Sequence, residues 1–559
     1  MSALNLLVFR GSQRRVCGHE LKASLVGQLE RLNGAPSTHG PSTQGLISAL
    51  LLAGELECGT ADADSVMWRS AALITDRIAD ALVSEKSGKS VFDLQSLAIA
   101  ARSISVPAQL SLSTPEGFAY YALHPLAYAE VLERISVPGN NLVIVGIRSI
   151  GSTLSAVTAA AARLRGMQVR RFTVRPQGHP YNRHTEFLPS QLGIVQSAVF
   201  SGATFVIVDE GPGLSGSSFL SVAEALEQAG VPNQKIVLLG SHEPNIDSLC
   251  ASDAAQRWRR FHYVAVAAEA RRPVEAVDFI GGGQWRSRLF HAESDWPAAW
   301  ISLERLKYLS AVEQGETRLY KFAGLGHYGA HVFEHEKKVA EGGFGPAPQL
   351  ESDGFVSYPW IKTSEVNARP IAASDLSPGI LARLAEYCAF RLRAFSTELS
   401  DLNALQQMAE HNLHELGLEA ATKLQLAHPV IADGHMQPHE WLLTKDGQLL
   451  KTDSGSHGDD HFFPGPTDIA WDLAGTIVEW HMDEHQAKEF LDVYRAASGD
   501  DARGRIDGFI QAYIAFRTAY CLMAANAMAG SDEQSRLEQA AVGYKAMLEK
   551  SAVRGMAAA

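Results

Sequence analysis

The chain has 559 residues, a net charge of −13 and 46% hydrophobic residues. This length predicts at least two domains, and the composition excludes a largely disordered or fibrous chain. So acidic a chain is a poor general binder of nucleic acid, and no apolar run is long enough to cross a bilayer. The five cysteines are scattered and form no C-x-x-C pair, which is typical of a reducing compartment. We therefore expect a cytoplasmic protein that binds neither nucleic acid nor membranes.

Mixed helix and loop are expected up to about residue 137, and a regular alternation of strands and helices follows. Short apolar runs rich in β-branched residues predict buried parallel strands at 142–147, 170–174, 205–209 and 235–240. Helices are expected between them, including 153–165 and 218–229. This alternation predicts an α/β domain with a doubly wound parallel sheet, in which ligands bind beyond the carboxyl ends of the strands.

Beyond about residue 268 the alternation ends, and the remaining elements are those of an α+β domain. The expected elements are a strand at 318–322, helices at 331–341, 380–396 and 402–416, and a hairpin of strands 441–443 and 449–451. The predicted division of the chain is an amino half 1–270, a connection 271–304 and a carboxyl half 305–559.

A strand that ends in two acids and runs into a loop of glycine and serine lies at 205–218 (FVIVDEGPGLSGSS). Paired carboxylates at a strand end, here Asp209 and Glu210, are suited to hold a diol or a hydrated metal. Amides and hydroxyls at the start of the next helix favour a phosphate. The residues concerned are Ser215, Gly216, Ser217 and Ser218. The alternative is an ordinary strand–turn–helix with a capping serine.

This segment resembles the phosphoribosyl-diphosphate signature of type I phosphoribosyltransferases, and in particular of orotate phosphoribosyltransferase-like proteins. The resemblance implies that Asp209 and Glu210 hold the ribose hydroxyls and that the serine loop holds the 5′-phosphate. The sequence departs from the family in two respects. The loop before Gly216 is one residue longer than usual, and the second acid is Glu where Asp is commoner.

Two further segments agree with this resemblance in order and spacing. GIRSIGS follows the first strand and resembles the pyrophosphate loop of the family. RPQGHPYNRH follows the second strand and resembles a basic stretch whose cations would neutralise the departing pyrophosphate; without the resemblance it would be a solvated basic loop. The resemblance thus assigns phosphate binding to Arg148, Ser149 and Gly151, and catalysis to Arg175, His179 and Arg183.

In the carboxyl half, DGHMQPHEWLL, a hairpin, TDSGSHGDDHFFPG and DIAWDLAG follow one another. This order resembles the aminoglycoside phosphotransferase and choline kinase-like family. The resemblance implies that Asp453 binds magnesium and that Asp472 supports the catalytic loop. It also implies that Lys321, on a strand, pairs with Glu336 on the next helix and holds nucleotide phosphates.

The carboxyl-half motif departs from that family at two positions. The catalytic Asp of the family falls on His435, and its Asn falls on Glu440. We expect His435 to accept a proton near pH 7, and Glu440 with Asp453 to hold magnesium, because hard cations prefer carboxylate oxygens. Three interpretations stay open: a divergent phosphotransferase, a nucleotide-binding domain with other transfer chemistry, and a kinase-shaped domain that only binds or scaffolds.

Two other patterns give competing interpretations. A histidine-rich stretch offers ligands for a transition metal, although it lacks an H-E-x-x-H spacing. Its members are His435, His439, His457, His461, Asp453, Asp459 and Asp460. GLGHYG at 324–329 fits G-x-G-x-x-G, but no βαβ unit surrounds it, so it predicts a turn after the Lys321 strand.

The sequence therefore predicts a two-domain enzyme for small-molecule substrates. Its amino half would transfer a 5-phosphoribosyl group at C1 with magnesium, using 5-phosphoribosyl diphosphate or pyrophosphate, and the acceptor is open. Its carboxyl half would be a divergent ATP-dependent phosphotransferase. The expected partners are a phosphoribosyl compound, a nucleotide and a second copy of the chain in a homodimer. The alternative is a nucleotide-sensing regulatory protein with a non-catalytic kinase-like half.

Overall fold

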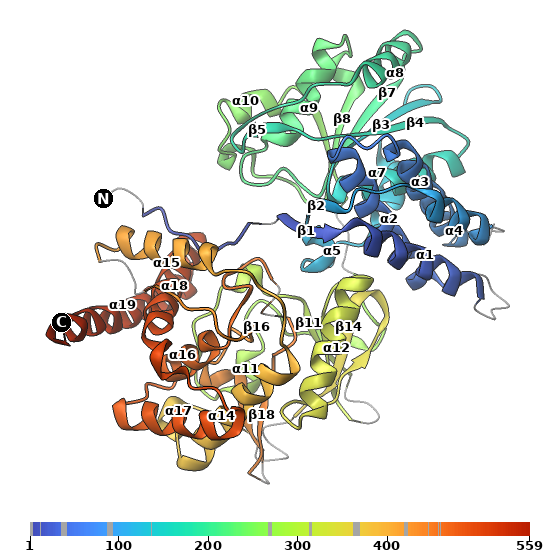
Figure 1. Cartoon of the computed structure of the whole chain (residues 1–559). Coiled ribbons are helices and arrows are strands. Elements are labelled where there is room, and N and C mark those ends of the chain that lie inside the picture. Colours follow the sequence, from blue (N-terminus) through green and yellow to red (C-terminus); the bar gives the residue numbers. More distant parts are fainter. Residues whose placement is uncertain are drawn as a thin grey trace.

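The computed structural model shows two halves, each built around a sheet of its own (Figure 1). The structure describes residues 4–558 with the exception of 12, 35–41, 87–92, 136, 267–270, 312–315, 362–368, 419–422, 445–446, 457 and 459. The amino half contains a parallel sheet, and the carboxyl half contains an antiparallel sheet followed by helices. The fold is therefore of mixed α/β type, as predicted.

Five parallel strands form the centre of the amino half in the order β4-β3-β7-β8-β9. Their bounds are β3 (Asn141–Ile147), β4 (Gln168–Val174), β7 (Thr204–Val208), β8 (Ile236–Gly240) and β9 (His262–Ala265). The four strands that the apolar runs predict are all present. The edge strand β9 was not predicted, because only half of its four residues are buried and its apolar run is very short.

Helices cover both faces of the parallel sheet, as a doubly wound fold requires. Ile144 and Val206 pack on one face with α7 and the helices α2 and α3, whereas Val145 and Phe205 pack on the other with α8, α9 and α10. These helices are α2 (Thr43–Asp62), α3 (Trp68–Lys86), α7 (Ile150–Leu164), α8 (Pro189–Phe200), α9 (Ser217–Gln228) and α10 (Ala254–Trp258). Neighbouring residues of one strand thus point to opposite faces, and both sides of the strands are buried.

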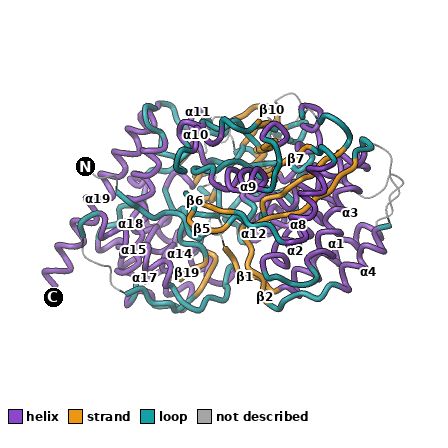
Figure 2. Tube along the Cα trace, turned by 90° about the horizontal axis from the view of Figure 1, so that it is seen from above, coloured by secondary structure: helices purple, strands orange, loops and turns teal. Residues whose placement is uncertain are grey.

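Further elements precede the sheet or follow its second strand. They are β1 (Gln13–Cys17), α1 (Gly18–Gly34), α4 (Leu94–Ser103), β2 (Gln109–Ser113), α5 (Glu116–Ala119), α6 (Ala127–Glu130), β5 (Gln177–His179) and β6 (Asn182–His184). Strands β1 and β2 pair antiparallel, and β5 and β6 form a hairpin. The helices α1 to α4 lie at the end of the molecule opposite to the helices that close the chain (Figure 2).

The carboxyl half begins with an antiparallel sheet in the order β10-β11-β12-β14-β13. Its strands are β10 (Ala276–Phe279), β11 (Lys307–Ser310), β12 (Arg318–Phe322), β13 (Gln349–Leu350) and β14 (Phe355–Pro359). The first of them lies inside the segment predicted as a connection, 271–304. Because β10 is short and a glycine triplet follows it, the sequence did not indicate a strand there.

The rest of the carboxyl half is mainly helical, with two small sheets. The helices are α12 (His327–Glu341), α14 (Pro378–Ala394), α15 (Asn403–Glu415), α16 (Ala470–Glu479), α17 (Glu484–Ser498), α18 (Ile506–Ala527) and α19 (Asp532–Ala558). The small sheets are formed by β15 (Arg369–Pro370), β17 (Trp441–Leu443) and β18 (Leu449–Lys451), and by β16 (Pro429–Ile431) and β19 (Pro466–Asp468). Among the described residues, no helix combines the length and apolar character needed to cross a membrane.

The first residues of the chain pack into the carboxyl half. The amide of Leu7 donates to Oδ1 of Asn412 (2.8 Å), and Nδ2 of Asn412 donates back to the carbonyl of Leu7 (2.8 Å). The amide of Phe463 donates to the carbonyl of Val8 (3.0 Å), and the side chain of Val8 is fully buried. The start of the chain therefore belongs to the carboxyl-half core, although the predicted division assigned it to the amino half.

Candidate functional sites

Asp209 and Glu210 follow β7 at the edge where the parallel strands end. The amide of Glu210 donates to Oδ1 of Asp209 (2.9 Å), and the amide of Gly117 donates to Oε2 of Glu210 (3.1 Å). Burial raises the pKa of Asp209 to about 8 and the pKa of Glu210 to about 7. Within the described part of the chain neither carboxylate forms an ion pair, so these two acids lie close together without a paired cation. Such acids fit ligand hydroxyls or a hydrated cation.

The predicted phosphate cradle lies between this acid pair and α9. Gly216 has φ 69°, and a Cβ there would lie 3.0 Å from the side chain of Leu249, so the position favours glycine. The hydroxyls of Ser215 and Ser217 both donate to the carbonyl of Pro180 (2.8 and 2.5 Å). The turn of the β5–β6 hairpin therefore sits on the serine hydroxyls. A phosphate that binds these hydroxyls would replace the Pro180 carbonyl as their acceptor.

The loop after β3 has the geometry of a close-approach loop. Ser149 has φ 105° and ψ −119°, a conformation that favours glycine and is strained for serine. A Cβ on Gly151 would lie 2.6 Å from the carbonyl oxygen of Val208, so glycine lets α7 start directly beside β7. Backbone strain of this kind clusters at ligand sites. The close approach of Gly151 to Val208 places this loop beside the acids that follow β7, and its role as a pyrophosphate loop stays a prediction.

Arg175 and Arg148 both contact Asp62, a residue that the sequence did not single out. Arg175 pairs with Oδ2 of Asp62 (2.5 Å) and donates to the carbonyl of Arg148 (2.9 Å), and Arg148 pairs with Oδ1 of Asp62 (3.0 Å). The charges of Arg175 and Arg183 still lower the pKa of the Asp209 carboxyl. The guanidinium of Arg175 is thus anchored on α2 and is close enough to act electrostatically at the acid pair. No sequence signal pointed to Asp62, because it ends a helix far away in the chain.

The hairpin residues predicted to be catalytic lie outside the acid pair. The carbonyl of Pro176 accepts a hydrogen bond from Nη1 of Arg183 (3.1 Å). His179 accepts a hydrogen bond from the amide of Tyr181 (3.3 Å), and its own segment is exposed. His179 therefore has no contact in the described structure that ties it to Asp209, and its catalytic role stays a prediction.

Lys321 and Asp453 come together in the carboxyl half. The Lys321 ammonium bonds to Oδ1 of Asp453 and lies 3.5 Å from the hydroxyl of Ser456. Lys307 lies opposite Lys321 in the register of β11 and β12. Burial lowers the pKa of Lys321, and the Asp453 carboxylate opposes that effect. The predicted nucleotide-binding lysine thus lies against the predicted metal ligand.

Glu336 on α12 takes partners other than the predicted one. Its carboxylate accepts hydrogen bonds from the amide of Gly455 (2.8 Å) and from the hydroxyl of Ser454 (3.1 Å). The predicted lysine–glutamate pair is replaced by this arrangement, in which Lys321 binds Asp453 and Glu336 holds the next two residues. Burial and the neighbouring Asp453 raise the pKa of the Glu336 carboxyl. Both side chains therefore fix the segment that starts at Asp453.

Asp472 forms hydrogen bonds with the backbone of the loop that contains His435. The Asp472 carboxylate accepts the amides of Asp433 and Gly434, each at 2.9 Å. The Tyr387 hydroxyl donates to the Asp433 carboxylate. Burial raises the pKa of Asp472 to about 6. The predicted support of this loop by Asp472 is present.

His435 and His439 flank the carboxylate of Glu440. Nδ1 of His435 and Nε2 of His439 each lie 3.9 Å from Oε1 of Glu440. The ring of Trp285 stacks near His439 with centroids 6.4 Å apart. Burial lowers the pKa of His439. The residue predicted as the base thus lies beside the residue predicted as a metal ligand.

Lys451 is the residue of this site that sequence reasoning missed. Its side chain is fully buried, and its ammonium bonds to the carbonyl of Asp453. It lies 3.5 Å from Oδ1 of Asp433 and 3.6 Å from Oε2 of Glu440. These carboxylates raise the pKa of Lys451 against the effect of burial, which keeps it charged. A lysine in a short hairpin strand is usually expected to face solvent, so no sequence pattern indicated that Lys451 is buried.

Each of the two carboxylates predicted to bind magnesium lies beside a lysine, and their role as metal ligands stays a prediction. Glu440 lies beside the Lys451 ammonium, and Asp453 binds the Lys321 ammonium. Over the described residues no three His, Cys, Asp or Glu side chains converge in a way that could hold a metal ion. The geometry of Glu440 and Asp453 fits two internal ammonium groups rather than a shared divalent ion.

The rival metal site of the histidine-rich stretch is not assembled by the residues that can be described. His457 and Asp459 lie outside the described residues. His461 lies among aromatic rings, with centroid distances of 4.5 Å to Phe462 and 5.3 Å to Tyr120. Burial lowers the pKa of His461 to about 4, with the cation of Arg305 adding to the effect. His461 is thus placed in an apolar and cationic setting that is unfavourable for a metal ion.

The turn after β10 is fixed against the carboxyl-half site by Glu304. The Glu304 carboxylate accepts the amide of Gly283 (2.6 Å) and Nε1 of Trp285 (2.7 Å), and it pairs with Lys307 (2.7 Å). Through Trp285 this turn reaches the ring of His439. The glycine triplet, which the sequence suggested was part of a connection, thus belongs to the carboxyl-half site.

The short helix α5 contacts both halves of the chain. The amide of Gly117 binds Glu210 of the amino half (3.1 Å), and the carbonyl of the next residue, Phe118, accepts the amide of Leu325 in the turn before α12 (2.9 Å). Arg305 lies over the ring of Tyr120, 5.1 Å from its centroid. One short segment thus contacts an acid of the amino-half site and the turn before α12 of the carboxyl half.

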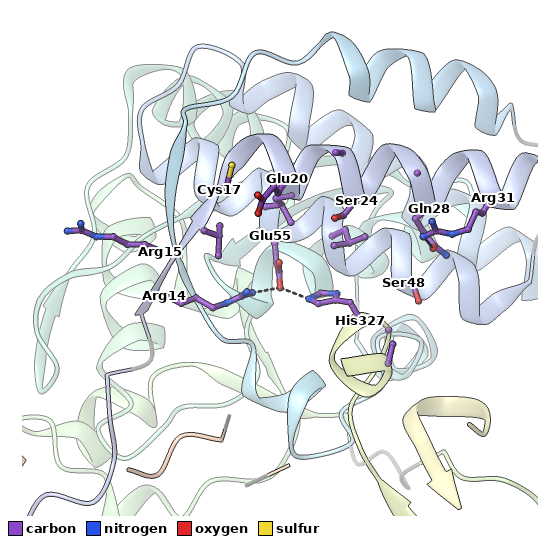
Figure 3. A pocket seen from close by; sticks show the side chains of 17 residues that line it. Arg14, Arg15, Cys17, Glu20, Ser24, Gln28, Arg31, Ser48, Glu55 and His327 are labelled. Atoms are coloured by element: carbon purple, nitrogen blue, oxygen red, sulfur yellow. Dashed lines mark hydrogen bonds and ion pairs between the residues drawn. The ribbon is translucent and has the colours of Figure 1, made fainter. Parts of the chain in front are cut away.

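A cavity of about 690 Å³ lies where the amino half meets the carboxyl half, between β1, α1, α2 and the first turn of α12 (Figure 3). At its inner end Arg14 (2.8 Å) and His327 (3.3 Å) both contact Oε1 of Glu55, as the dashed lines in Figure 3 show. None of the residues predicted to be functional lines this cavity. It is therefore separate from both candidate sites.

Comparison with known proteins gives matches only among solved structures. No model of a protein family matches the chain, and no curated protein matches it. A choline/ethanolamine kinase family protein from Mesorhizobium loti is 18% identical, with 44% of this chain and 85% of that chain covered and a TM-score of 0.32. Choline kinase LicA from Streptococcus pneumoniae is 14% identical, with 43% and 90% covered and a TM-score of 0.28.

An aminoglycoside phosphotransferase from Alicyclobacillus acidocaldarius is 11% identical, with 51% of this chain and 97% of that chain covered and a TM-score of 0.29. Each of these proteins is thus similar to about half of this chain. At such identities and TM-scores, the similarities carry no conclusion about activity or substrate. The resemblance of the amino half to phosphoribosyltransferases rests on its residues alone.

Proposed function

We propose that the amino half binds 5-phosphoribosyl diphosphate and transfers its phosphoribosyl group at C1. The observation that carries this proposal is the convergence of three loops from the neighbouring strands β4, β3 and β7. They bring the acid pair Asp209 and Glu210, the strained Ser149 and the cation Arg175 to one edge of the sheet. Ligands of doubly wound sheets bind at this edge.

In the proposed reaction the bond between C1 and the diphosphate oxygen breaks, and a bond between C1 and the acceptor forms. Pyrophosphate leaves with the electron pair of the broken bond. The carboxylates of Asp209 and Glu210 would hold the ribose hydroxyls, and Arg175 would offset the charge that develops on pyrophosphate. Magnesium would supply further neutralisation of the diphosphate, and the same two carboxylates would face it.

The test is calorimetric titration of the full chain with 5-phosphoribosyl diphosphate and magnesium. We expect Asp209→Asn with Glu210→Gln to weaken binding by about 100-fold or more, because the two carboxyl groups that would hold the ribose hydroxyls are lost. The matched control is Asp247→Asn with Glu133→Gln, the same changes at exposed positions. Equal affinity of wild type and the acid-pair variant would refute the proposal.

For the carboxyl half we propose binding of a nucleoside triphosphate. The observation that favours it is the meeting of Lys321, Asp453 and the loop held by Asp472 at one place. Lys321→Met should then lower ATP affinity by about tenfold or more, because a buried ammonium near the phosphates is lost. Lys337→Met, on the exposed side of α12, is the control.

Phosphoryl transfer by this half, with His435 as the base, is the finer form of the same proposal. Turnover distinguishes it from a nucleotide-sensing role. Catalysis is supported if His435→Ala lowers the rate of ATP consumption while the affinity for ATP stays unchanged. ATP binding without any consumption over a broad set of small hydroxyl compounds supports the sensing alternative.

A further inference from the structure

Lys451 occupies the centre of the carboxyl-half site. Its side chain is fully buried, and its ammonium contacts the carbonyl of Asp453 and the carboxylates of Asp433 (3.5 Å) and Glu440 (3.6 Å). A buried charge is retained only when it is paired. Lys451 thus joins three segments of the site: the loop before His435, the start of the hairpin and the segment that begins at Asp453.

A second buried ammonium completes this arrangement. Lys321 reaches Oδ1 of Asp453, and its side chain is 9% exposed. The two carboxylates predicted to share a divalent ion, Glu440 and Asp453, therefore each lie against an internal lysine. A further cation placed between them would meet the repulsion of both ammonium groups at short range, where the protein interior screens charge poorly.

Acids beside a phosphate chain repel it unless their charge is neutralised. A divalent ion is one way to neutralise them, and fixed ammonium groups are another. We infer that Lys451, together with Lys321, takes the place of the divalent ion in the carboxyl half, so that this half binds nucleotide phosphates without a metal. This inference rests on the nucleotide binding proposed above. Lys451 is a positioning residue in this arrangement, because it acts through Glu440 and Asp453.

The experiment is calorimetric titration of the wild-type full chain with ATP, once with EDTA and once with excess magnesium chloride. We expect the two dissociation constants to agree within about threefold, a difference below 1 kcal/mol. ATP binding that is at least about tenfold weaker in EDTA would overturn the inference and leave the proposed nucleotide binding intact. Failure to bind ATP in both solutions would refute the proposed nucleotide binding itself, and the inference with it.

Variants show whether Lys451 is responsible. Lys451→Met should weaken ATP binding in EDTA by about tenfold or more, and magnesium should restore part of the affinity, because the ammonium that repels the ion beside Glu440 is removed. Lys451→Arg keeps the charge and should bind ATP within about threefold of wild type in EDTA. If Lys451→Met does not fold, the double variant Lys451→Met with Glu440→Gln replaces it, because it removes both charges of the pair. This double variant should bind ATP in EDTA, and magnesium should not increase its affinity. Unchanged affinity of Lys451→Met in EDTA would overturn the inference.

Discussion

In the amino half, Asp209 and Glu210 accept hydrogen bonds from amides and form no ion pair with any described residue, whereas in the carboxyl half Asp453 and Glu440 each lie beside a buried lysine. Asp209 and Glu210 follow one strand, whereas Glu440 directly precedes the β17–β18 hairpin and Asp453 follows it. Only the first pair has no partner cation among the described residues, and burial raises its pKa values to about 8 and 7.

The two sites thus differ in whether their acids already have partner cations before a phosphorylated ligand binds. A pair of uncompensated buried acids is costly, and a ligand that brings hydroxyls or a cation relieves the cost. Acids that are already neutralised by internal lysines are satisfied before the ligand arrives. We therefore expect the two halves to respond differently to charge removal, to pH and to divalent ions.

The largest effect should come from breaking the lysine network of the carboxyl half. Lys451→Met removes the buried ammonium that lies 3.5 Å from Asp433 and 3.6 Å from Glu440, and removing one partner of a buried ion pair typically costs about 3–5 kcal/mol of stability. Adding Glu440→Gln should recover part of this loss, because one of the unpaired charges is removed. Unfolding in urea, followed by tryptophan fluorescence, measures both variants. A loss below about 1 kcal/mol for the single variant would contradict the pairing described for Lys451.

The acid pair of the amino half should make stability depend on pH. Asp209 and Glu210 keep their protons in the folded chain up to about pH 8 and 7, while in the unfolded chain they release them near pH 4. The unfolded state thus binds fewer protons in this range, and the contribution of the pair to stability falls as pH rises from about 4 to 8.

Asp209→Asn with Glu210→Gln should remove this dependence. Relative to wild type the variant should gain stability between pH 5 and 7, by at most about 1.4 kcal/mol per pH unit for each carboxyl. Denaturant unfolding at several pH values measures the difference. Parallel pH profiles of wild type and variant would show that the two acids are not held in their neutral form.

A smaller effect is expected at the hairpin that covers the phosphate cradle. Ser217→Ala removes a hydrogen bond to the carbonyl of Pro180 and should cost about 1 kcal/mol or less locally. The amides of 177–184 should then exchange with solvent faster, as hydrogen exchange can measure. Ser248→Ala, which removes a local hydroxyl on an exposed turn, is the control. Unchanged exchange in the hairpin would mean that the cradle hydroxyls do not hold it.

Much of the amino half could be predicted from the sequence because its signals are local. Apolar runs such as 142–147 give buried parallel strands, and the acids at the end of 205–209 must lie at the edge of the sheet. Contacts that depend on distant segments could not be predicted. Asp62 meets Arg175 across more than a hundred residues, and nothing in the sequence around either residue shows it.

The carboxyl half was predicted less well because its strands are short and its charges lie inside. Strand β10 has four residues, too few to give a clear alternation of apolar and polar positions. Lys451 lies on a three-residue strand, and a single lysine there does not reveal whether it faces solvent or a cluster of acids. The support of the loop by Asp472 could be predicted, because the order of the motif residues was retained.

The difference between the halves is tested most directly by titrating the full chain with 5-phosphoribosyl diphosphate and with ATP, each in EDTA and in excess magnesium. Uncompensated acids in the amino half predict that affinity for 5-phosphoribosyl diphosphate falls by about tenfold or more in EDTA. The lysines of the carboxyl half predict that ATP affinity changes by less than about threefold. An equal response of the two ligands to removal of magnesium would contradict this account.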